Sequence, residues 1–221
     1  MPDVPAHTSG AATTGQPSEP STLPHHEPGE IDPAVAAEAA DLLSVARAMA
    51  EESRGFLSTV TEVASGANPD SGIPLLLLAV SDLLAAGARL GAMLDVVPPE
   101  RFEPDVGPEP DVDALRIALG NVLDGLDEYF AVVDPLLDAE VETCALSGDL
   151  VSIAGAVAQG LQHYEEGQVL EALWWWQFSY LSGWGERTSS VLRVLQVLLG
   201  HLRLDVDDDV AAEAEYDALQ R

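Results

Sequence analysis

The sequence predicts an all-α protein, a helical bundle of about five to six helices with disordered termini. Apolar residues recur at helical spacing through most of the chain, short turns rich in Pro and Gly separate these segments, and no segment is typical of a β-strand. A chain of 221 residues with 47% hydrophobic residues is long enough to bury one core. We therefore expect residues 32–203 to form a single all-α helical domain.

The two ends of the chain differ from this domain in composition. Residues 1–31 are rich in Pro, Ser, Thr and Gly and have no periodicity, which predicts a disordered N-terminal tail. Residues 204–221 include the run "DVDDD" and predict a mobile or weakly helical acidic C-terminal tail.

Helix signals mark the first two elements. Asp32 is a suitable N-cap and Pro33 suits the first helical position, so a first helix is expected to begin here. The segment "SGANPDSG" then turns the chain. Pro74 is expected to open a second helix that continues to about Val97.

The middle of the chain is interrupted by prolines. Residues 98–110 are Pro-rich and acidic and predict a solvated loop. A third helix is expected from the cap residue Asp111 to about Val133. Pro135 should break it, and a short helix to about Leu146 should follow.

Two further helices complete the predicted bundle. The segment "SGDLVSIAGAVAQGLQHYEEG" predicts a helix that is capped by Ser147 or Asp149 and ends at Gly167. The last long helix should run from about Val169 to Leu202.

This last helix contains all four tryptophans, in the stretch "EALWWWQFSYLSGWG". On a wheel of 100° per residue, one apolar stripe collects Leu173, Trp174, Leu181, Trp184, Val191, Leu192, Leu195, Leu198 and Leu199. The opposite face collects Trp175, Ser179, Ser182, Glu186 and Arg193. A large aromatic residue within a polar rim is typical of a binding anchor. The alternative is that another helix, or a loop such as 98–110, covers this face.

The same stretch resembles an uncharacterised bacterial family, the DUF5063 domain of unknown function. Its members read Leu-Trp-Glu-Trp-Arg-Phe-Ser-Phe, followed by His-Trp-Gly, where this chain has "LWWWQFSY" and "GWG". This chain departs from the pattern at Trp175, Gln177 and Gly183, which replace an acidic residue, Arg and His. The resemblance covers residues 34–202 in layout, and it implies an all-helical cytoplasmic domain without established catalytic residues.

The charge of the chain restricts its partners. There are 38 acidic residues and nine cations, all of them arginine, which gives a net charge of −29. Such a field repels phosphate backbones and anionic lipid, so direct nucleic-acid or membrane binding is not expected. A protein partner, preferably a basic one, or a second copy of the chain in a homodimer is expected instead.

Localisation is predicted from two further features. Residues 1–30 contain no apolar leader segment, and the lone Cys144 cannot form an intramolecular disulfide. The apolar stretch 73–97 contains Asp82, Arg89 and Asp95, so it predicts a buried helix and no membrane span. We expect a cytoplasmic protein.

Enzyme chemistry has weak support in the sequence. Asp124 and Asp127 form an Asp-x-x-Asp, and Glu165, Glu166 and Glu171 follow it, so a carboxylate site for a metal ion is one hypothesis. No phosphate-binding Gly-rich loop, nucleophile elbow or Glu-x-x-His pair supports it.

The sequence therefore favours a non-catalytic interaction or adaptor protein, with no cofactor. Its alternatives are an acidic regulator that docks on a basic DNA-binding protein and a metal-dependent enzyme with a carboxylate site in the bundle.

Overall fold

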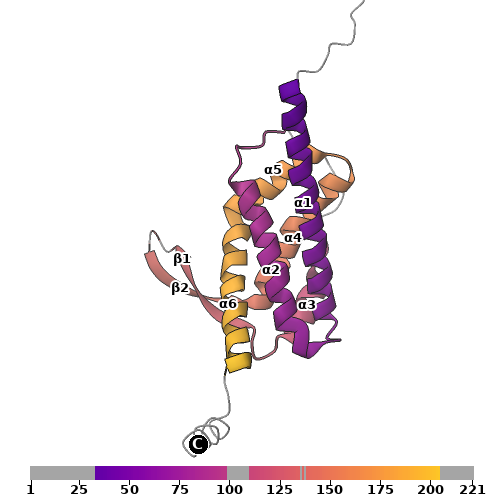
Figure 1. The fold of residues 1–221 in the computed structure, drawn as a ribbon. Coiled ribbons are helices and arrows are strands. Elements are labelled where there is room, and N and C mark those ends of the chain that lie inside the picture. The colour runs from indigo at the N-terminus through magenta and orange to yellow at the C-terminus, as the bar shows by residue number, and fades with distance from the viewer. Residues whose placement is uncertain (1–32, 99–109, 135, 137, 205–221) are drawn as a thin grey trace, which may run out of the picture.

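The computed structural model describes residues 33–98, 110–134, 136 and 138–204. These residues form a mostly helical bundle, as the sequence predicts, with one small two-stranded sheet (Figure 1). The expectation that no strand forms is therefore wrong. The predicted tails, the cap at Asp32 and nearly all of the predicted loop 98–110 lie outside the described residues.

Helices α1, Pro33–Ala64, and α2, Pro69–Gly91, pack against each other as a pair. Between them Gly66 has a φ of 68°, a conformation that glycine adopts without steric cost. Helix α2 begins before Pro74, because Pro69 suits the first helical turn, where no backbone N–H is needed. It ends at Gly91, well before the predicted Val97.

Helix α2 lies between α1 and α6 in the bundle (Figure 1). Among the described residues it is the one helix long and apolar enough to cross a membrane by length and composition. One face of it is buried against the other helices, and this face consists of Gly72, Ile73, Leu76, Val80, Leu83, Ala86, Gly87 and Leu90.

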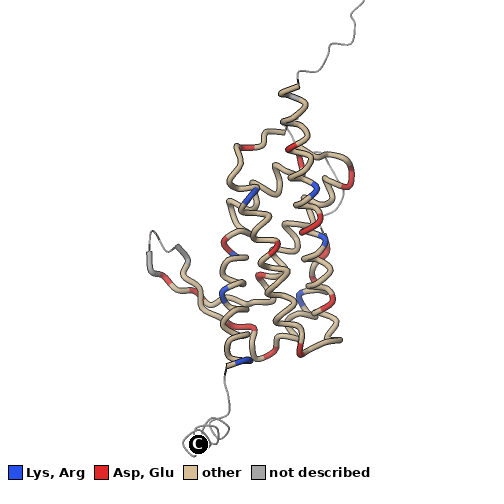
Figure 2. Tube along the Cα trace, in the orientation of Figure 1, with Lys and Arg blue, Asp and Glu red and all other residues tan. Residues whose placement is uncertain are grey.

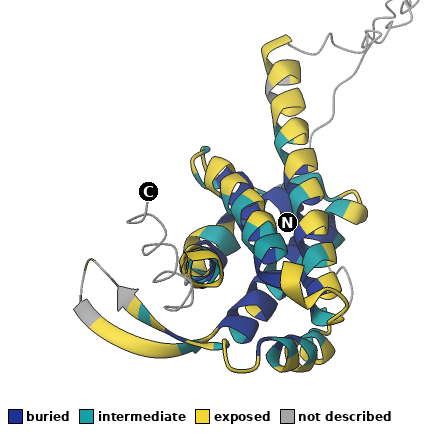
Figure 3. Ribbon diagram, turned by 60° about the horizontal axis from the view of Figure 1, so that its bottom comes forward, coloured by how far each residue is buried: buried dark blue, intermediate teal, exposed yellow. Residues whose placement is uncertain are grey.

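The central segment differs most from the prediction. Helix α3, Asp113–Val122, ends early, and the chain continues as strands β1, Glu128–Asp134, and β2, Asp138–Ala145. The two strands pair in antiparallel register, with Val132 opposite Val141. The predicted helices up to Val133 and Leu146 are wrong here because Tyr, Phe and Val cluster in β1, where these residue types favour an extended chain. The hairpin projects from the bundle beside α6 (Figures 1 and 3).

The C-terminal half consists of α4, Leu146–Glu165, α5, Val169–Ser179, a π-helical turn η1, Tyr180–Trp184, and α6, Gly185–Leu204. Gly167 has a φ of 81° and follows the end of α4, as predicted. The single long helix predicted for this region is thus interrupted by η1, in which one extra residue is accommodated per turn.

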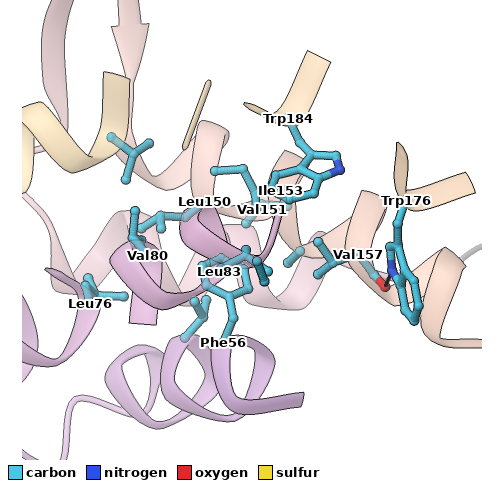
Figure 4. Packing of buried hydrophobic residues seen from close by; sticks show 14 of the residues in the cluster. Phe56, Leu76, Val80, Leu83, Leu150, Val151, Ile153, Val157, Trp176 and Trp184 are labelled. Carbon is cyan, nitrogen blue, oxygen red and sulfur yellow. Dashed lines mark hydrogen bonds between the residues drawn. The ribbon is translucent and has the colours of Figure 1, made fainter. Parts of the chain in front are cut away.

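The core lies where α1, α2, α4 and α6 meet, with Phe56, Leu83 and Ile153 fully or almost fully buried (Figure 4). Trp176 is also fully buried, and its Nε1 donates a hydrogen bond of 3.0 Å to the Val157 carbonyl. It packs against Gly160 of α4, which leaves room for the indole because it has no side chain.

Candidate functional site

An open groove lies between strand β1 and helix α6, and it has a volume of about 710 Å³. The strand side is formed by Gly125, Leu126 and the β1 residues 128–132. The helix side is formed by one face of α6 between Glu186 and His201. Its volume falls in the range of about 300–1,000 Å³ that is usual for ligand sites. The groove is the candidate functional site.

The walls of the groove combine exposed apolar side chains with polar and charged ones. Phe130 is 69% exposed, and Val132 and Val197 are also exposed to solvent. Glu186 and Arg193 from α6 add one charge of each sign. Exposed apolar side chains beside charged ones are typical of protein docking surfaces.

The root of the hairpin, which we define as the part of β1 at Tyr129 next to the bundle, is held in place by Asp149 of α4. The side chain of Asp149 is nearly buried. The Tyr129 hydroxyl donates a hydrogen bond of 2.5 Å to Oδ2 of Asp149, and Nη1 of Arg187 donates one of 2.7 Å to Oδ1. These bonds join β1, α4 and α6 at one point. Tyr129, one of the residues that line the groove, is therefore held in place against the bundle.

The groups at this root are held in unreactive protonation states. Burial, followed by the hydrogen bond to Asp149, raises the pKa of Tyr129 far above its usual value. The hydrogen bond to Asp149 raises the pKa of Arg187. Burial raises the pKa of the Cys144 thiol, and Glu142 and Asp149 raise it further. At neutral pH, the phenol and the thiol are neutral and the guanidinium is charged.

A second carboxylate ties the hairpin to α4. Asp127 accepts hydrogen bonds from the Ser147 backbone N–H at 2.6 Å and from its hydroxyl at 2.8 Å, and so caps the first turn of the helix. The residue at the N-cap position itself is Ala145, without a side-chain cap. The prediction that Ser147 or Asp149 caps this helix is wrong, because the cap comes from a residue outside it.

The predicted contact face begins at Trp175, which is half-buried. Its Nε1 donates a hydrogen bond of 2.9 Å to the Ala156 carbonyl of α4. Of the two alternatives for this residue, the structure shows that another helix partly covers it. The Ser179 hydroxyl donates to the Trp175 carbonyl at 2.6 Å and accepts a hydrogen bond from Trp184 Nε1 at 3.1 Å.

The rest of the predicted face lies apart from Trp175. Glu186 and Arg193 line the groove, whereas Ser182 lies in η1, exposed, and donates to the Phe178 carbonyl. The π turn separates the two groups of residues. The π turn also explains why Leu181, which was predicted for the core, is 62% exposed. A wheel of 100° per residue loses its phase where the helix has more residues per turn.

The other residues of the predicted core stripe differ in how far they are buried. Leu173, Trp184, Val191 and Leu195 are buried. Half-buried positions in the same stripe are Trp174, Leu192, Leu198 and Leu199. Trp176, which belongs to neither the predicted stripe nor the opposite face, is fully buried.

Two of the carboxylates in the metal hypothesis, Asp127 and Glu165, have other roles in the structure. Asp127 caps the start of α4, and Glu165 at the other end of this helix pairs with Arg54 at 3.0 Å. A helix of 20 residues is about 30 Å long, so these groups cannot share one ion. Across the described ranges, no three residues among His, Cys, Asp and Glu are placed to hold a metal ion.

Sequence reasoning missed the hairpin, and with it Tyr129, Phe130 and Asp149 as determinants of the site. The signal that could have indicated it is the segment "EYFAVVD", where aromatic and β-branched residues stand together before Pro135. The pairing of Tyr129 with Asp149 has no local signal, since the two residues lie on different elements.

Comparisons with known proteins agree with the fold. The family model described as Domain of unknown function (DUF5063) matches residues 40–201. No curated protein matches the chain. A crystal structure of protein BF1032 from Bacteroides fragilis is similar, with a TM-score of 0.56 and 14% sequence identity. The similarity covers 73% of this chain and 93% of that one, and at this identity it concerns the fold alone.

Proposed function

The chain belongs to the DUF5063 family, and we propose that this member is a non-catalytic cytoplasmic interaction protein that docks a protein partner in the groove between β1 and α6. The observation that carries the proposal is the open groove, whose lining includes the exposed apolar side chains of Phe130, Val132 and Val197.

The form of the hairpin supports docking. A two-stranded hairpin is marginally stable by itself in water, yet this one extends away from the bundle (Figure 3). Phe130 and Val132 on one strand and Val141 on the other are exposed. A partner that covers them would remove apolar surface from water, which is favourable by about 25 cal/mol per Å².

The fixed root of the groove also supports docking. Asp149 holds Tyr129 of β1 and Arg187 of α6, and Asp127 holds Ser147 of α4. These contacts set the position of the strand against the helix before any partner arrives. A preformed surface loses less conformational entropy on binding.

The chemistry near the groove favours binding over catalysis. A general base or nucleophile needs a pKa close to the working pH. The pKa of Tyr129 and that of Cys144 are both raised away from neutrality. Asp149 is bound by two donors.

A regulator that imitates the phosphates of DNA would need carboxylates at regular spacing across one face. In Figure 2 the described acidic residues are spread over the helices and the hairpin and are interspersed with arginines. Two of them are paired with Arg54 and Arg187. This arrangement adds no support to that alternative.

The test is a comparison of variants that place a charge inside and outside the groove. Phe130→Glu changes an exposed residue of the groove, and Ile117→Glu changes an exposed residue of α3 outside it. Proteins that co-purify from the native host are identified, and each candidate is then purified and titrated against the wild type and both variants by calorimetry.

We expect a partner that binds the wild type and Ile117→Glu alike, and that Phe130→Glu weakens by about tenfold or more, since a charge then enters an apolar contact. Trp175→Phe keeps an aromatic ring and removes the hydrogen bond to the Ala156 carbonyl. It tests whether the contact face predicted around Trp175 from the sequence takes part in binding. A partner affected by Trp175→Phe and not by Phe130→Glu would contradict the groove.

A further inference from the structure

We propose that the groove receives an extended, basic segment of a partner protein, which adds to the free edge of β1 as a third strand between β1 and α6. This inference rests on the proposed docking function and concerns how the same groove is used.

The lining of the groove shows that it runs along the edge of β1. Every residue from Glu128 through Val132 contributes to it, and no residue of β2 does. Neighbouring residues of a strand point to opposite faces of the sheet, so a groove on one face would meet only alternate residues. A groove that meets all of them in succession borders the edge.

That edge is available for pairing. β1 pairs with β2 on one side, and within the described part of the chain no other strand joins this sheet. Alternate residues of an edge strand direct their backbone N–H and C=O groups away from their partner. Such an edge is a template for a further strand, which is a known mode of peptide recognition.

The dimensions of the groove suit a short extended peptide. Five residues of β1 line it, which corresponds to about 15 Å of strand. The lining residues of α6, from Glu186 to His201, correspond to about 22 Å of helix. A segment of about five to seven residues in extended form fits this length.

Charge selects the occupant. The chain has a net charge of −29, and Glu128 and Glu186 line the groove beside Arg193. The exposed Glu140 and Glu142 on β2 add to the negative field of the hairpin. The acidic segment 205–221 and a second copy of the chain would both bring charge of the same sign, whereas a basic segment is attracted.

The occupant also needs apolar side chains. Side chains on one face of an added strand would lie beside Phe130 and Val132, which are exposed and apolar. A sequence that alternates apolar and basic residues meets both conditions.

The experiment uses a synthetic probe, the acetylated and amidated peptide Lys-Val-Lys-Val-Lys-Val-Lys, with a fluorescent label for anisotropy titration of the full chain. Two further peptides carry backbone N-methyl groups, one at every Val and the other at every Lys. In an added strand the N–H groups of one set face β1 and those of the other set face away. A fourth peptide has Glu in place of Lys.

Strand addition predicts an asymmetric result. One N-methylated peptide should bind about tenfold or more weakly than the unmodified peptide, since several backbone hydrogen bonds are lost, while the other keeps its affinity. The Glu peptide should not bind. Backbone amide resonances of β1 should shift and exchange more slowly with solvent when the unmodified peptide is bound.

Variants separate this mode from docking in general. Phe130→Thr removes the ring and introduces a β-branched residue, which also favours a strand, so peptide binding should weaken. Ile117→Ser, outside the groove, should have no effect. Circular dichroism checks that both variants fold as the wild type does.

Two outcomes would overturn the inference. If both N-methyl series change the affinity of the peptide equally, strand addition is excluded. If Phe130→Thr nevertheless binds the peptide more weakly, the proposal that a partner docks in the groove is still supported. If the chain alone sediments as a dimer that Phe130→Thr dissociates, the edge is occupied by a second copy and not by a basic segment.

Discussion

Trp176 and Trp184 show how single residues decide the packing of the tryptophan segment. Both are buried, and both lie against a glycine of another helix, Gly160 in α4 and Gly87 in α2. A Cβ atom at either glycine would overlap the indole ring. The glycines therefore serve as sites of close approach, where the absence of a side chain is required.

The role of Gly160 can be tested by adding one methyl group. Gly160→Ala should lower the free energy of unfolding by about 1–3 kcal/mol, because the new Cβ meets Trp176 in a closed core. Gly155→Ala in the same helix has open space around it and should be neutral or stabilising by up to about 1 kcal/mol. Urea unfolding measures both. If both substitutions change the free energy of unfolding equally, the close contact between Gly160 and the Trp176 indole is not what requires glycine at this position.

At the scale of elements, the π turn η1 shifts the phase between α5 and α6, and both helices still direct apolar side chains to the core. Leu173 in α5 and Val191 and Leu195 in α6 are fully buried. Leu181, which a wheel of 100° per residue places on the same stripe, is 62% exposed. The extra residue in Tyr180–Trp184 directs Leu181 outward. Gly185, the first residue of α6, packs against Tyr180 of this turn.

Deletion of a single residue distinguishes the π turn from an ordinary helix. Removing Ser182, which is exposed, should let η1 close into regular α-helix with both flanking faces still directed to the core, so the free energy of unfolding should change by less than about 2 kcal/mol. Removing Ser189, which follows the π turn, should rotate Val191 and Leu195 by about 100° and destabilise the fold by several times as much. Thermal and urea unfolding compare the two, and similar losses would contradict this role of η1.

At the scale of the whole molecule, three elements meet at Asp149. Tyr129 from β1 and Arg187 from α6 both bind this residue of α4, so the hairpin, which makes few other contacts with the bundle, is held in one orientation. The groove exists because of this junction. Its geometry depends on residues that lie 20 and 38 positions from Asp149 in the sequence.

The junction predicts a dependence of stability on alkaline pH. The pKa of Tyr129 is raised by burial and Asp149 above its ordinary value of about 10. Its contribution is therefore complete below pH 10 and is lost as the pH rises toward the raised value. From pH 10 to 11 the wild type should lose about 1 kcal/mol more of its unfolding free energy than Tyr129→Phe. Parallel urea titrations at both pH values measure this, and parallel losses in the two proteins would contradict it.

The sequence by itself determined the helical class, the start of α1 at Pro33 and the glycine that ends α4. These features depend on helical periodicity and on residues such as Pro33 and Gly167, whose conformational preferences act within one or two turns. It also indicated family membership through the tryptophan segment. Local signals were sufficient for each of these because each depends on neighbours along the chain.

Only the tertiary structure decided the hairpin, the register after η1 and the groove. In "EYFAVVD" the apolar residues fit a helix or a strand, and pairing with β2 and the bond from Tyr129 to Asp149 select the strand. The burial of Trp176 depends on space at Gly160 in another helix. Such choices rest on contacts between residues far apart in the chain, whose energies no local pattern of the sequence contains.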